Sequence, residues 1–219
     1  MGLTLYHCHN ARSFRALWAL EELGLTYELH MLPFPPRAFA RDYLKINPLG
    51  TIPFFIDGET RMTESAAIAE YLAARYGDGK LGVRPDEPAF GTYLNALDYG
   101  EATLTFPQTL VLRYLRLEPE ERRQPTVAAD YAKWFLARLR ALQAILETSD
   151  YVAANRFTAA DISVGYALLL AGSLDIPLPD WTGPYWTRLT DRPGYQAAQA
   201  AQLRAAEAQG LRVVPLNAL

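Results

Sequence analysis

Short alternating runs and one helical stretch make up the pattern of apolar and polar residues in the first part of the chain. Leu3–Tyr6 alternates as a half-buried strand does, and Thr26–Leu32 repeats this alternation. Between them, from Ala11 to Leu23, apolar side chains recur at helical spacing, and Gly24 follows as a helix stop. The order strand, helix, strand predicts a βαβ unit with parallel strands and a right-handed connection.

The next apolar run, Ile52–Ile56, contains a proline at its second position. Proline cannot donate to a sheet ladder, so Pro53 predicts one of two arrangements. It lies at an edge-facing position, or its peptide bond is cis and turns the main chain of Ile52 outward. Asp57-Gly58 after the run predicts a tight hairpin turn, and the preceding Asn47–Gly50, with its proline and glycine, marks a loop.

Glu64 and Ser65 open a helical pattern that extends to about Tyr76. The first amides of a helix have no partner within it and form a favourable seat for a carboxylate. The stretch from Asn47 to Ser65 therefore combines an exposed peptide edge, an anion-accepting helix start and a carboxylate that can hold an ammonium group. These groups can bind a short peptide by its main chain and its amino-acid-like end.

Glycines, prolines and charged residues replace the periodic pattern between Gly77 and Pro88, which predicts a linker between two domains, 1–78 and 88–219. Beyond the linker the pattern is helical only. We expect a long helix from Phe90, further helices over 131–147 and 157–171, and two shorter ones within 180–219. The apolar stripe of the first helix, interrupted by Glu101, consists of Phe90, Leu94, Leu97 and Leu104.

Composition narrows the class of protein. The 219 residues are 50% hydrophobic, enough for an ample core in one large or two small domains. A net charge of -3 gives no electrostatic footprint for nucleic acid or an anionic membrane. No apolar run approaches the roughly 20 residues of a membrane span, and Arg12 and Arg15 interrupt the N-terminal apolar residues that a signal peptide needs. With the single cysteine Cys8, these features predict a soluble cytoplasmic protein without disulfides.

Two motifs at this spacing resemble the glutathione-binding half of the cytosolic glutathione S-transferase superfamily. They are Asn-Pro-x-Gly-x-Ile-Pro from Asn47 and Glu-Ser-x-Ala-Ile-x-x-Tyr-Leu from Glu64. Residues 11–29, 156–169 and 185–198 are also similar to family segments, so the resemblance covers nearly the whole chain. It implies an α/β thioredoxin-like N-terminal domain and an all-α helical-bundle domain that contributes a hydrophobic pocket. It also implies a homodimer with glutathione as co-substrate, no metal and no tightly bound cofactor.

The resemblance implies glutathione contacts at residues of the same motifs. Ile52 would offer main-chain hydrogen bonds to the cysteinyl part, with Pro53 holding that geometry. Ser65 would take the γ-glutamyl carboxylate and Glu64 the ammonium group. The family often has a polar side chain just before Ile-Pro for the glycine carboxylate. The candidates here are Thr51, Lys45, Arg41 and Arg37.

Glutathione reacts as the thiolate, and the resemblance places the group that stabilises it at the end of the first strand or in the following turn. Aligning Leu23-Gly24 with the family's helix end puts Asn10 where serine-type members carry their serine. An asparagine amide can donate to a thiolate but cannot act as a general base. Asn10 is also expected to cap the helix that follows. Arg12 is the strongest nearby source of positive charge, and the other candidates are Tyr6, His9 and Ser13.

Residues of the helical half receive roles through the resemblance as well. Glu101 is expected to reach the active site of the partner subunit. Tyr99, Thr103 and Phe106 are expected either to line the pocket for the electrophile or to pack between helices. Thr158 and Asp161, three residues apart, predict an N-capping box with a structural role.

Three functions fit these features. Conjugation of glutathione to a small hydrophobic electrophile is the leading hypothesis. Glutathione-dependent disulfide or peroxide reduction would use the same site, and a non-catalytic binding protein on this fold is the third possibility. Cys8 is either able to form a mixed disulfide with glutathione or a small packing residue. The sequence contains no Cys-x-x-Cys, metal-ligand spacing, catalytic triad or Gly-rich phosphate loop, and it does not identify the electrophile.

Overall fold

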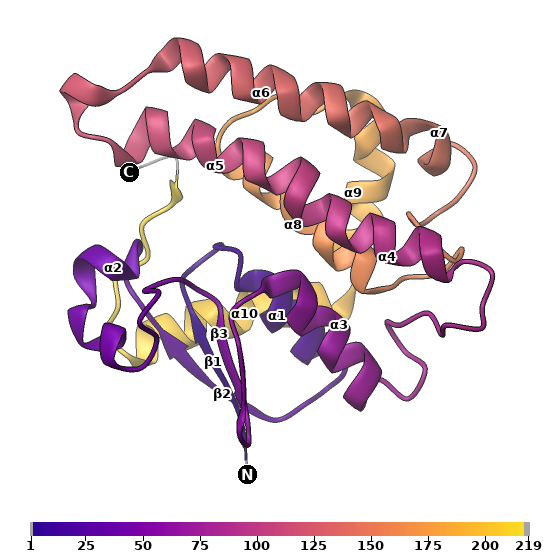
Figure 1. The fold of residues 1–219 in the computed structure, drawn as a ribbon, viewed down its shortest axis with the longest axis horizontal. Helices are drawn as coiled ribbons and strands as arrows, with labels where there is room; N and C mark the ends of the chain where they lie inside the picture. Colours follow the sequence, from indigo (N-terminus) through magenta and orange to yellow (C-terminus); the bar gives the residue numbers. More distant parts are fainter. Residues whose placement is uncertain (1, 217–219) are drawn as a thin grey trace. The chain divides into compact units, whose positions relative to one another are not determined.

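The computed structural model describes residues 2–216, and the contacts among them divide the chain into two units (Figure 1). The first comprises the chain up to Lys80 together with Asp191–Val214. The second comprises Leu81–Thr190 with the described residues after Val214. The division after Lys80 falls inside the predicted linker. The assignment of Asp191–Val214 differs from the predicted second domain of 88–219, because its helix packs on residues of the N-terminal half.

A four-stranded sheet in the order β2-β1-β3-β4 lies at the centre of the first unit. Its strands are β1 (Leu3–His7), β2 (Tyr27–Met31), β3 (Phe54–Asp57) and β4 (Thr60–Met62). β1 is parallel to β2, as the sequence predicted, and antiparallel to β3. β3 and β4 form the predicted hairpin, whose turn contains Gly58 at a φ of 57°.

The first unit also contains helices from both of its chain segments. They are α1 (Phe14–Glu22), α2 (Pro36–Phe39), the 3₁₀ turn η1 (Arg41–Lys45), α3 (Ser65–Tyr76) and α10 (Pro193–Ala208). α3 begins and ends where the sequence predicted. α1 packs against both α3 and α10. The largest buried side chains of the unit include Leu5, Phe14, Trp18, Phe55 and Leu72.

The helix expected from Ala11 begins later, at Phe14, with Ser13 as its N-cap residue. Asn10 has a φ of 50°, in the left-handed region that asparagine tolerates better than most residues. Tight turns follow it, in which the amide of Ala11 donates to the carbonyl of Cys8 at 3.1 Å. The prediction that Asn10 caps α1 is therefore wrong, because these turns separate Asn10 from the helix.

α10 returns from the end of the chain to lie beside α1 (yellow and indigo in Figure 1). At its start the Arg192 guanidinium donates to both carboxylate oxygens of Glu22 at 2.8 Å, and the Trp18 indole donates to the same carboxylate at 3.0 Å. A Cβ at Gly194 would lie 2.5 Å from the Glu22 side chain, so glycine permits this close approach. Beyond the helix, the side-chain amide of Gln209 bonds to the main chain of β2 at 2.8 and 2.9 Å.

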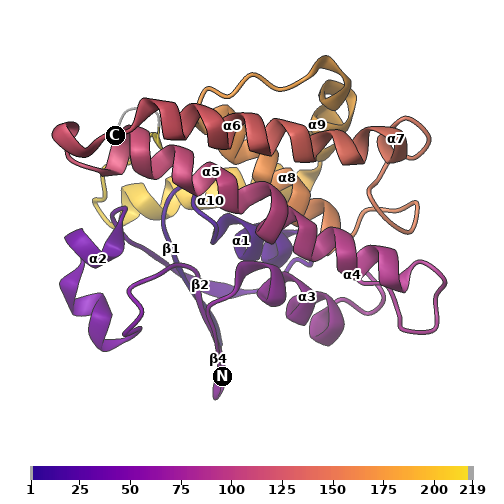
Figure 2. The same ribbon diagram turned by 45° about the horizontal axis from the view of Figure 1, so that its top comes forward.

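The second unit is built from helices (Figure 2). Its α-helices are α4 (Phe90–Asp98), α5 (Phe106–Leu112), α6 (Pro125–Leu139), α7 (Gln143–Leu146), α8 (Ala159–Ser173) and α9 (Gly183–Thr190). Two π-helical segments are η2 (Tyr99–Thr105) and η3 (Arg113–Leu117), and 3₁₀ turns are η4 (Glu120–Arg122), η5 (Arg140–Leu142) and η6 (Asp180–Thr182). The predicted long helix from Phe90 thus continues through α4, η2 and α5. The predicted helix over 131–147 corresponds to α6 and α7, and that over 157–171 to α8.

The buried face of α4 differs from the predicted stripe. Leu97 is buried, but Leu94 is 36% exposed and Tyr93 is buried instead. The segment lies against α8 at Gly100, where a Cβ would be 2.4 Å from the Ser163 hydroxyl oxygen. The same hydroxyl donates to the carbonyl of Leu97 at 2.6 Å. Both α4 and η2 pack against α8, a partner that the periodicity of the sequence could not identify.

The predicted N-capping box at the start of α8 is confirmed. One carboxylate oxygen of Asp161 accepts from the main-chain N–H of Thr158 at 2.9 Å. The other accepts from the amide of Val152 and the hydroxyl of Tyr185, both at 3.0 Å. Burial raises the pKa of Asp161 to about 6. All of these bonds join elements of the second unit, so the role of the pair is structural.

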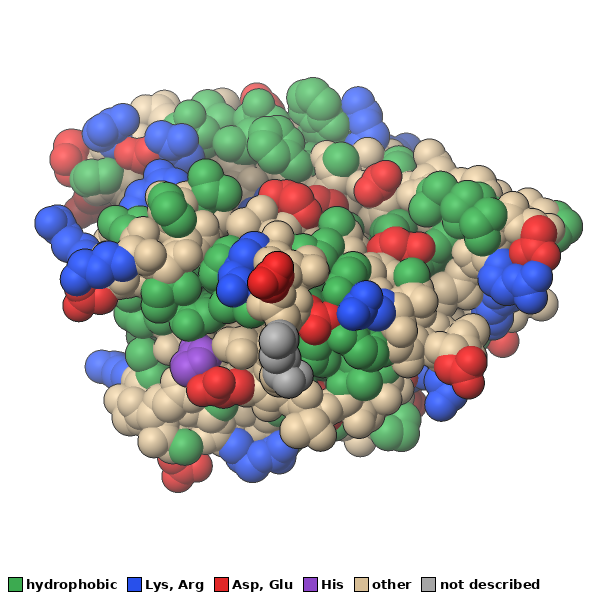
Figure 3. All heavy atoms as spheres, turned by 60° about the horizontal axis from the view of Figure 1, so that its bottom comes forward, with side chains coloured by type: hydrophobic (Ala, Val, Ile, Leu, Met, Phe, Trp, Pro, Cys, Tyr) green, Lys and Arg blue, Asp and Glu red, His purple; other side chains and the backbone are tan. Residues whose placement is uncertain are grey.

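Within residues 2–216, no helix combines the length and apolar character needed to cross a membrane. On the face drawn in Figure 3, acidic and basic side chains are interspersed with hydrophobic ones rather than gathered into an area of one charge.

Candidate active site

The register of the sheet brings two chain segments to the same edge. Tyr6, near the end of β1, lies opposite Phe54, the first residue of the antiparallel β3, so the turns after β1 and the loop before β3 are neighbours. The Ile52–Pro53 peptide is cis, the second of the two arrangements that the sequence left open. Among the described residues, the main-chain N–H and C=O of Ile52 make no hydrogen bond. Both groups can therefore pair with an extended peptide.

Neighbouring side chains hold the loop that leads to this edge. The Asn47 side-chain amide donates to the carbonyl of Thr51 at 2.9 Å, and the Tyr43 hydroxyl donates to the same oxygen at 2.7 Å. Arg37 donates to the carbonyl of Leu49 at 2.9 Å. Asn47 and Tyr43 are buried, so the loop is anchored to the body of the first unit. The sequence indicated the loop but not the role of Tyr43.

The start of α3 has the predicted arrangement. Glu64 is the N-cap residue, with an extended main chain, and Ser65 is the first helical residue. The amide of Ile68 closes the first turn by donating to the carbonyl of Glu64 at 2.9 Å. The earlier amides of the helix have no intrahelical acceptor, which favours an anion at this end. The side chain of Glu64 is exposed, whereas Ser65 is buried.

Arg15 is a functional candidate that the sequence reasoning missed. It is fully buried in α1, and its guanidinium donates to the Ser65 hydroxyl oxygen at 3.0 Å. Because that oxygen accepts from Arg15, the Ser65 hydroxyl proton is directed elsewhere and can serve a carboxylate. The charge of Arg15 also favours an anion at the start of α3. The sequence signal was an arginine between the apolar Phe14 and Trp18, within the apolar pattern of the helix.

Asn10 and Arg12 lie in the turns between β1 and α1, next to the loop that leads to β3. Both residues are half-buried. The Asn10 side-chain oxygen accepts from the side-chain amide of Gln202 at 2.8 Å, and its main-chain N–H donates to Gln202 at 3.0 Å. Ser13, another candidate, is fully buried and accepts from the main-chain N–H of Cys8 at 3.3 Å. Asn10 is thus held through contacts from α10.

The remaining candidates near β1 are less suited to stabilising a thiolate. Tyr6 stacks on His30 of β2, with ring centroids 4.7 Å apart. Burial raises the pKa of the Cys8 thiol, which lies 3.7 Å from the carbonyl of Pro33, and this disfavours the thiolate that a mixed disulfide requires. Burial also lowers the pKa of His9, which disfavours its positive charge.

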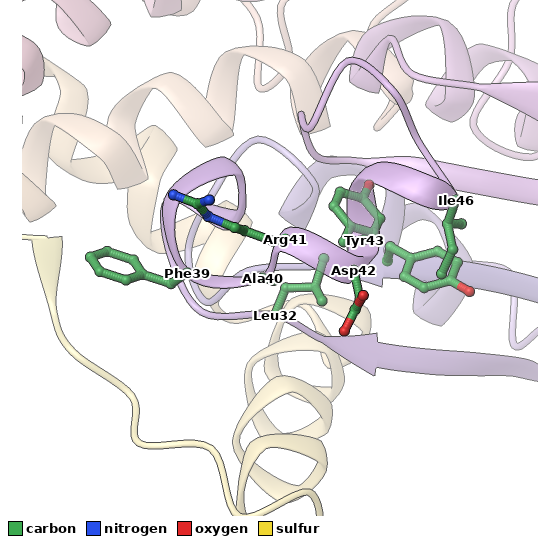
Figure 4. A pocket seen from close by; sticks show the side chains of 8 residues that line it. Leu32, Phe39, Ala40, Arg41, Asp42, Tyr43 and Ile46 are labelled. Atoms are coloured by element: carbon green, nitrogen blue, oxygen red, sulfur yellow. The ribbon is translucent and has the colours of Figure 1, made fainter.

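The basic candidates for the glycine carboxylate occupy different positions. The Lys45 ammonium pairs with Asp42 at 2.7 Å, and both side chains are largely exposed. Arg41 and Asp42 line a hollow of about 350 Å³, and Figure 4 shows them pointing to different sides of it. The hollow is completed by Tyr6, Leu32, Phe39, Ala40, Tyr43 and Ile46. Among the described residues, the recorded partner of the Lys45 ammonium is thus Asp42 rather than a group of the Ile52 edge.

The candidates in the second unit lie on η2 and α5. The Tyr99 hydroxyl donates to the carbonyl of Arg138 in α6 at 2.7 Å, which corresponds to the helix-packing alternative for this residue. Glu101 and Thr103 are half-exposed, and Phe106 is 55% exposed. Across residues 2–216, no group of His, Cys, Asp and Glu side chains is arranged to hold a metal ion.

Comparisons with known proteins point in the same direction as this geometry. Residues 1–74 match the family model "Glutathione S-transferase, N-terminal domain". The chain is 32% identical to the glutathione S-transferase GstB of Escherichia coli (strain K12) over 203 residues, which cover 87% of this chain and 94% of that protein. It is 33% identical to glutathione S-transferase 3 of Schizosaccharomyces pombe, but that match spans 47% of this chain and only 42% of that protein. A sphingomonad glutathione S-transferase solved with glutathione has the same fold, with a TM-score of 0.79 at 24% identity over 91% of this chain and 98% of that chain.

Proposed function

The chain belongs to the glutathione S-transferase family, and we propose that it joins the thiolate of reduced glutathione to a small hydrophobic electrophile. The sulfur forms a bond to an electrophilic carbon, the leaving group departs with its electron pair, and the thiol proton goes to solvent. One observation carries the proposal. The register of the sheet presents the main chain of Ile52 and the turn of Asn10 at one edge, and the Arg15 guanidinium of α1 donates a hydrogen bond to Ser65 at the start of α3.

Glutathione binding follows from these groups. The N–H and C=O of Ile52 pair with the cysteinyl main chain, as in addition of a strand to an open edge. The Ser65 hydroxyl and the first amides of α3 hold the γ-glutamyl carboxylate, beside the positive charge of Arg15. The exposed Glu64 carboxylate holds the ammonium group. Thr51 and Lys45 are the proposed contacts of the glycine carboxylate, with Arg41 as a third.

Asn10 is the proposed donor to the thiolate, with Arg12 as a second source of positive charge. Because α1 begins only at Phe14, the amides at the helix start lie beyond Asn10, and the hydrogen bond must come from its side-chain amide. Asparagine has no acidic proton to exchange, so it stabilises the thiolate but does not remove its proton. The burial of Cys8 argues against disulfide reduction through that thiol.

The proposal extends to a cytoplasmic homodimer. Exposed apolar side chains in each unit support assembly: Phe39 is 69% exposed, Leu49 56% and Phe106 55%. In this dimer Glu101 contacts the partner's active site. The ring of Tyr99, with Thr103 and Phe106, lines the pocket for the electrophile.

The decisive experiment is glutathione binding to a double variant. Glu64→Ala with Ser65→Ala removes the proposed ammonium contact and one carboxylate contact, and we expect the affinity to fall tenfold or more, about 1.4 kcal/mol. Conjugation of glutathione to an aryl halide should weaken in parallel. Calorimetry measures the affinity, and absorbance of the conjugate measures the reaction.

Glu59→Ala with Thr60→Ala is the matched control, because these exposed hairpin residues remove one carboxylate and one hydroxyl away from the site. The control should bind as the unmodified protein does. Unchanged affinity in the Glu64 and Ser65 variant would contradict the proposed site, and a protein that binds glutathione without conjugating it would contradict the proposed reaction.

A further inference from the structure

Gln202 of α10 connects the end of β1 to the turn that follows it. Its side chain is fully buried and bonded at both ends of the amide. The oxygen lies 2.9 Å from Nε2 of His7 and 3.0 Å from the main-chain nitrogen of Asn10. The nitrogen lies 2.8 Å from Oδ1 of Asn10 and 2.7 Å from Oε1 of Gln199. Gln202 thus contacts Asn10 at both main chain and side chain, although the two are 192 residues apart.

The direction of each bond follows from one group that can only donate. The main-chain N–H of Asn10 has no acceptor capacity, so the Gln202 atom that faces it must be the oxygen. The other end of the Gln202 amide is then NH₂ and must donate to the Asn10 side chain. The Asn10 atom that receives this bond is therefore its oxygen, and the NH₂ of Asn10 is the end directed away from Gln202.

The orientation of Gln202 fixes the tautomer of His7. Because the Gln202 oxygen accepts, Nε2 of His7 must carry the ring proton. Burial lowers the pKa of His7 to about 4, so the ring is neutral and carries a single N–H. Nδ1 of His7 is buried and has no partner among the described residues, so the bond to Gln202 alone selects the tautomer.

We propose that Gln202 is a positioning residue, which holds the carbonyl end of the Asn10 amide so that its NH₂ end is presented to the sulfur of glutathione. This inference rests on the proposed function, in which Asn10 donates to the thiolate. An NH₂ group carries two donors, so one can serve the sulfur whatever else Asn10 contacts. The left-handed main chain at Asn10, at a φ of 50°, is pinned by the same Gln202 oxygen.

The sharpest variant is Gln202→Glu, which keeps the size of the side chain and the acceptor for His7 and for the Asn10 N–H. A carboxylate oxygen now faces the Asn10 side chain, which must turn its NH₂ toward α10 and its oxygen toward the sulfur. We expect the thiol pKa of bound glutathione to rise and kcat to fall about tenfold. The KM for glutathione should change less than twofold, because the contacts at Ile52 and Ser65 are untouched. Thiolate absorbance of the complex across pH measures the pKa.

Gln196→Glu is the matched control, because it adds the same charge at an exposed position of α10, and it should leave kcat and the thiol pKa unchanged. Gln202→Met removes the hydrogen bonds of Gln202 without adding charge and should give a smaller rise in the thiol pKa. This variant serves as the test if Gln202→Glu does not fold. In Asn10→Ala, adding Gln202→Glu should cause no further loss of kcat, because Gln202 acts through Asn10.

Three results decide between the inference and the proposed function. If Asn10→Ala raises the thiol pKa and lowers kcat while Gln202→Glu and Gln202→Met change neither, the role of Gln202 is overturned and the role of Asn10 stands. A further tenfold loss from Gln202→Glu in the Asn10→Ala background also overturns the positioning role. If Asn10→Ala itself leaves both quantities unchanged, the proposed donor is wrong, and the inference fails with it.

Discussion

The two sides of the candidate site are held in different ways. On the side proposed to bind the glutathione main chain, the loop before Ile52 is held by Asn47 and Tyr43, which are 4 and 8 residues from the Thr51 carbonyl that they bind. On the side proposed to bind the sulfur, Asn10 is held by Gln202, 192 residues away. The first side can form from one continuous stretch. The second is incomplete until α10 has docked, so binding and activation of glutathione should respond differently to changes in α10.

The largest expected effect concerns the side proposed to bind the sulfur, where His7 contacts Gln202. We expect His7 to make the stability of the protein depend on pH. Burial holds the pKa of His7 at about 4 in the folded state, below its ordinary value of 6.5. Between these values the unfolded chain binds the proton and the folded chain does not. The free energy of unfolding should therefore fall by up to about 3 kcal/mol as the pH decreases from 6.5 toward 4. Urea unfolding across this range measures the loss.

His7→Gln should remove this part of the loss, whereas His30→Asn, at a half-exposed position of β2, should retain it. Asp161 acts in the opposite sense, because its raised pKa of about 6 makes its contribution favour the folded state at low pH. Both variants keep Asp161 and the half-buried His9, so their difference compares the buried His7 with the half-exposed His30. Equal pH dependence in the two variants would show that burial does not lower the pKa of His7 in the folded protein.

An intermediate effect should come from the ion pair that docks α10 on α1. The side chain of Glu22 is only 7% exposed and accepts two hydrogen bonds from Arg192, so Arg192→Met should lower the free energy of unfolding by about 2 kcal/mol. Loosening α10 should also lower kcat while sparing the KM for glutathione. Arg188→Met breaks the more exposed pair with Asp150 and should cost less than about 1 kcal/mol. A raised KM with unchanged kcat in Arg192→Met would refute the division between the two sides.

The smallest effect should come from the loop itself. Asn47→Ala removes the amide that holds the Thr51 carbonyl and the oxygen that accepts from the amide of Leu49, at a cost of about 1 kcal/mol in stability. The KM for glutathione should rise about fivefold, since the Ile52 edge is held less firmly, and kcat should be unchanged. Asn95→Ala, at an exposed position of α4, serves as the control. A loss of kcat with unchanged KM would reverse the assignment of the loop to binding.

The sequence by itself determined the features that depend on near neighbours. The parallel βαβ unit, the hairpin at Gly58, the bounds of α3 and the capping box of Thr158 and Asp161 all rest on turn residues, short-range periodicity or partners a few positions apart. The same signals supported the resemblance to the glutathione S-transferase superfamily. Such contacts produce a recognisable sequence pattern, because the residues that make them lie within one short segment.

Only the tertiary structure decided how the sulfur side of the site is built. The start of α1 at Phe14, the left-handed Asn10, the bond from Arg15 to Ser65 and the docking of Gln202 depend on partners from distant segments. A periodic pattern shows that Arg15 lies in an apolar helix and that α10 is amphipathic, but it cannot show which element each one meets. Hydrogen-bond partners become defined when the sheet register and the helix packing bring distant donors and acceptors within about 3 Å.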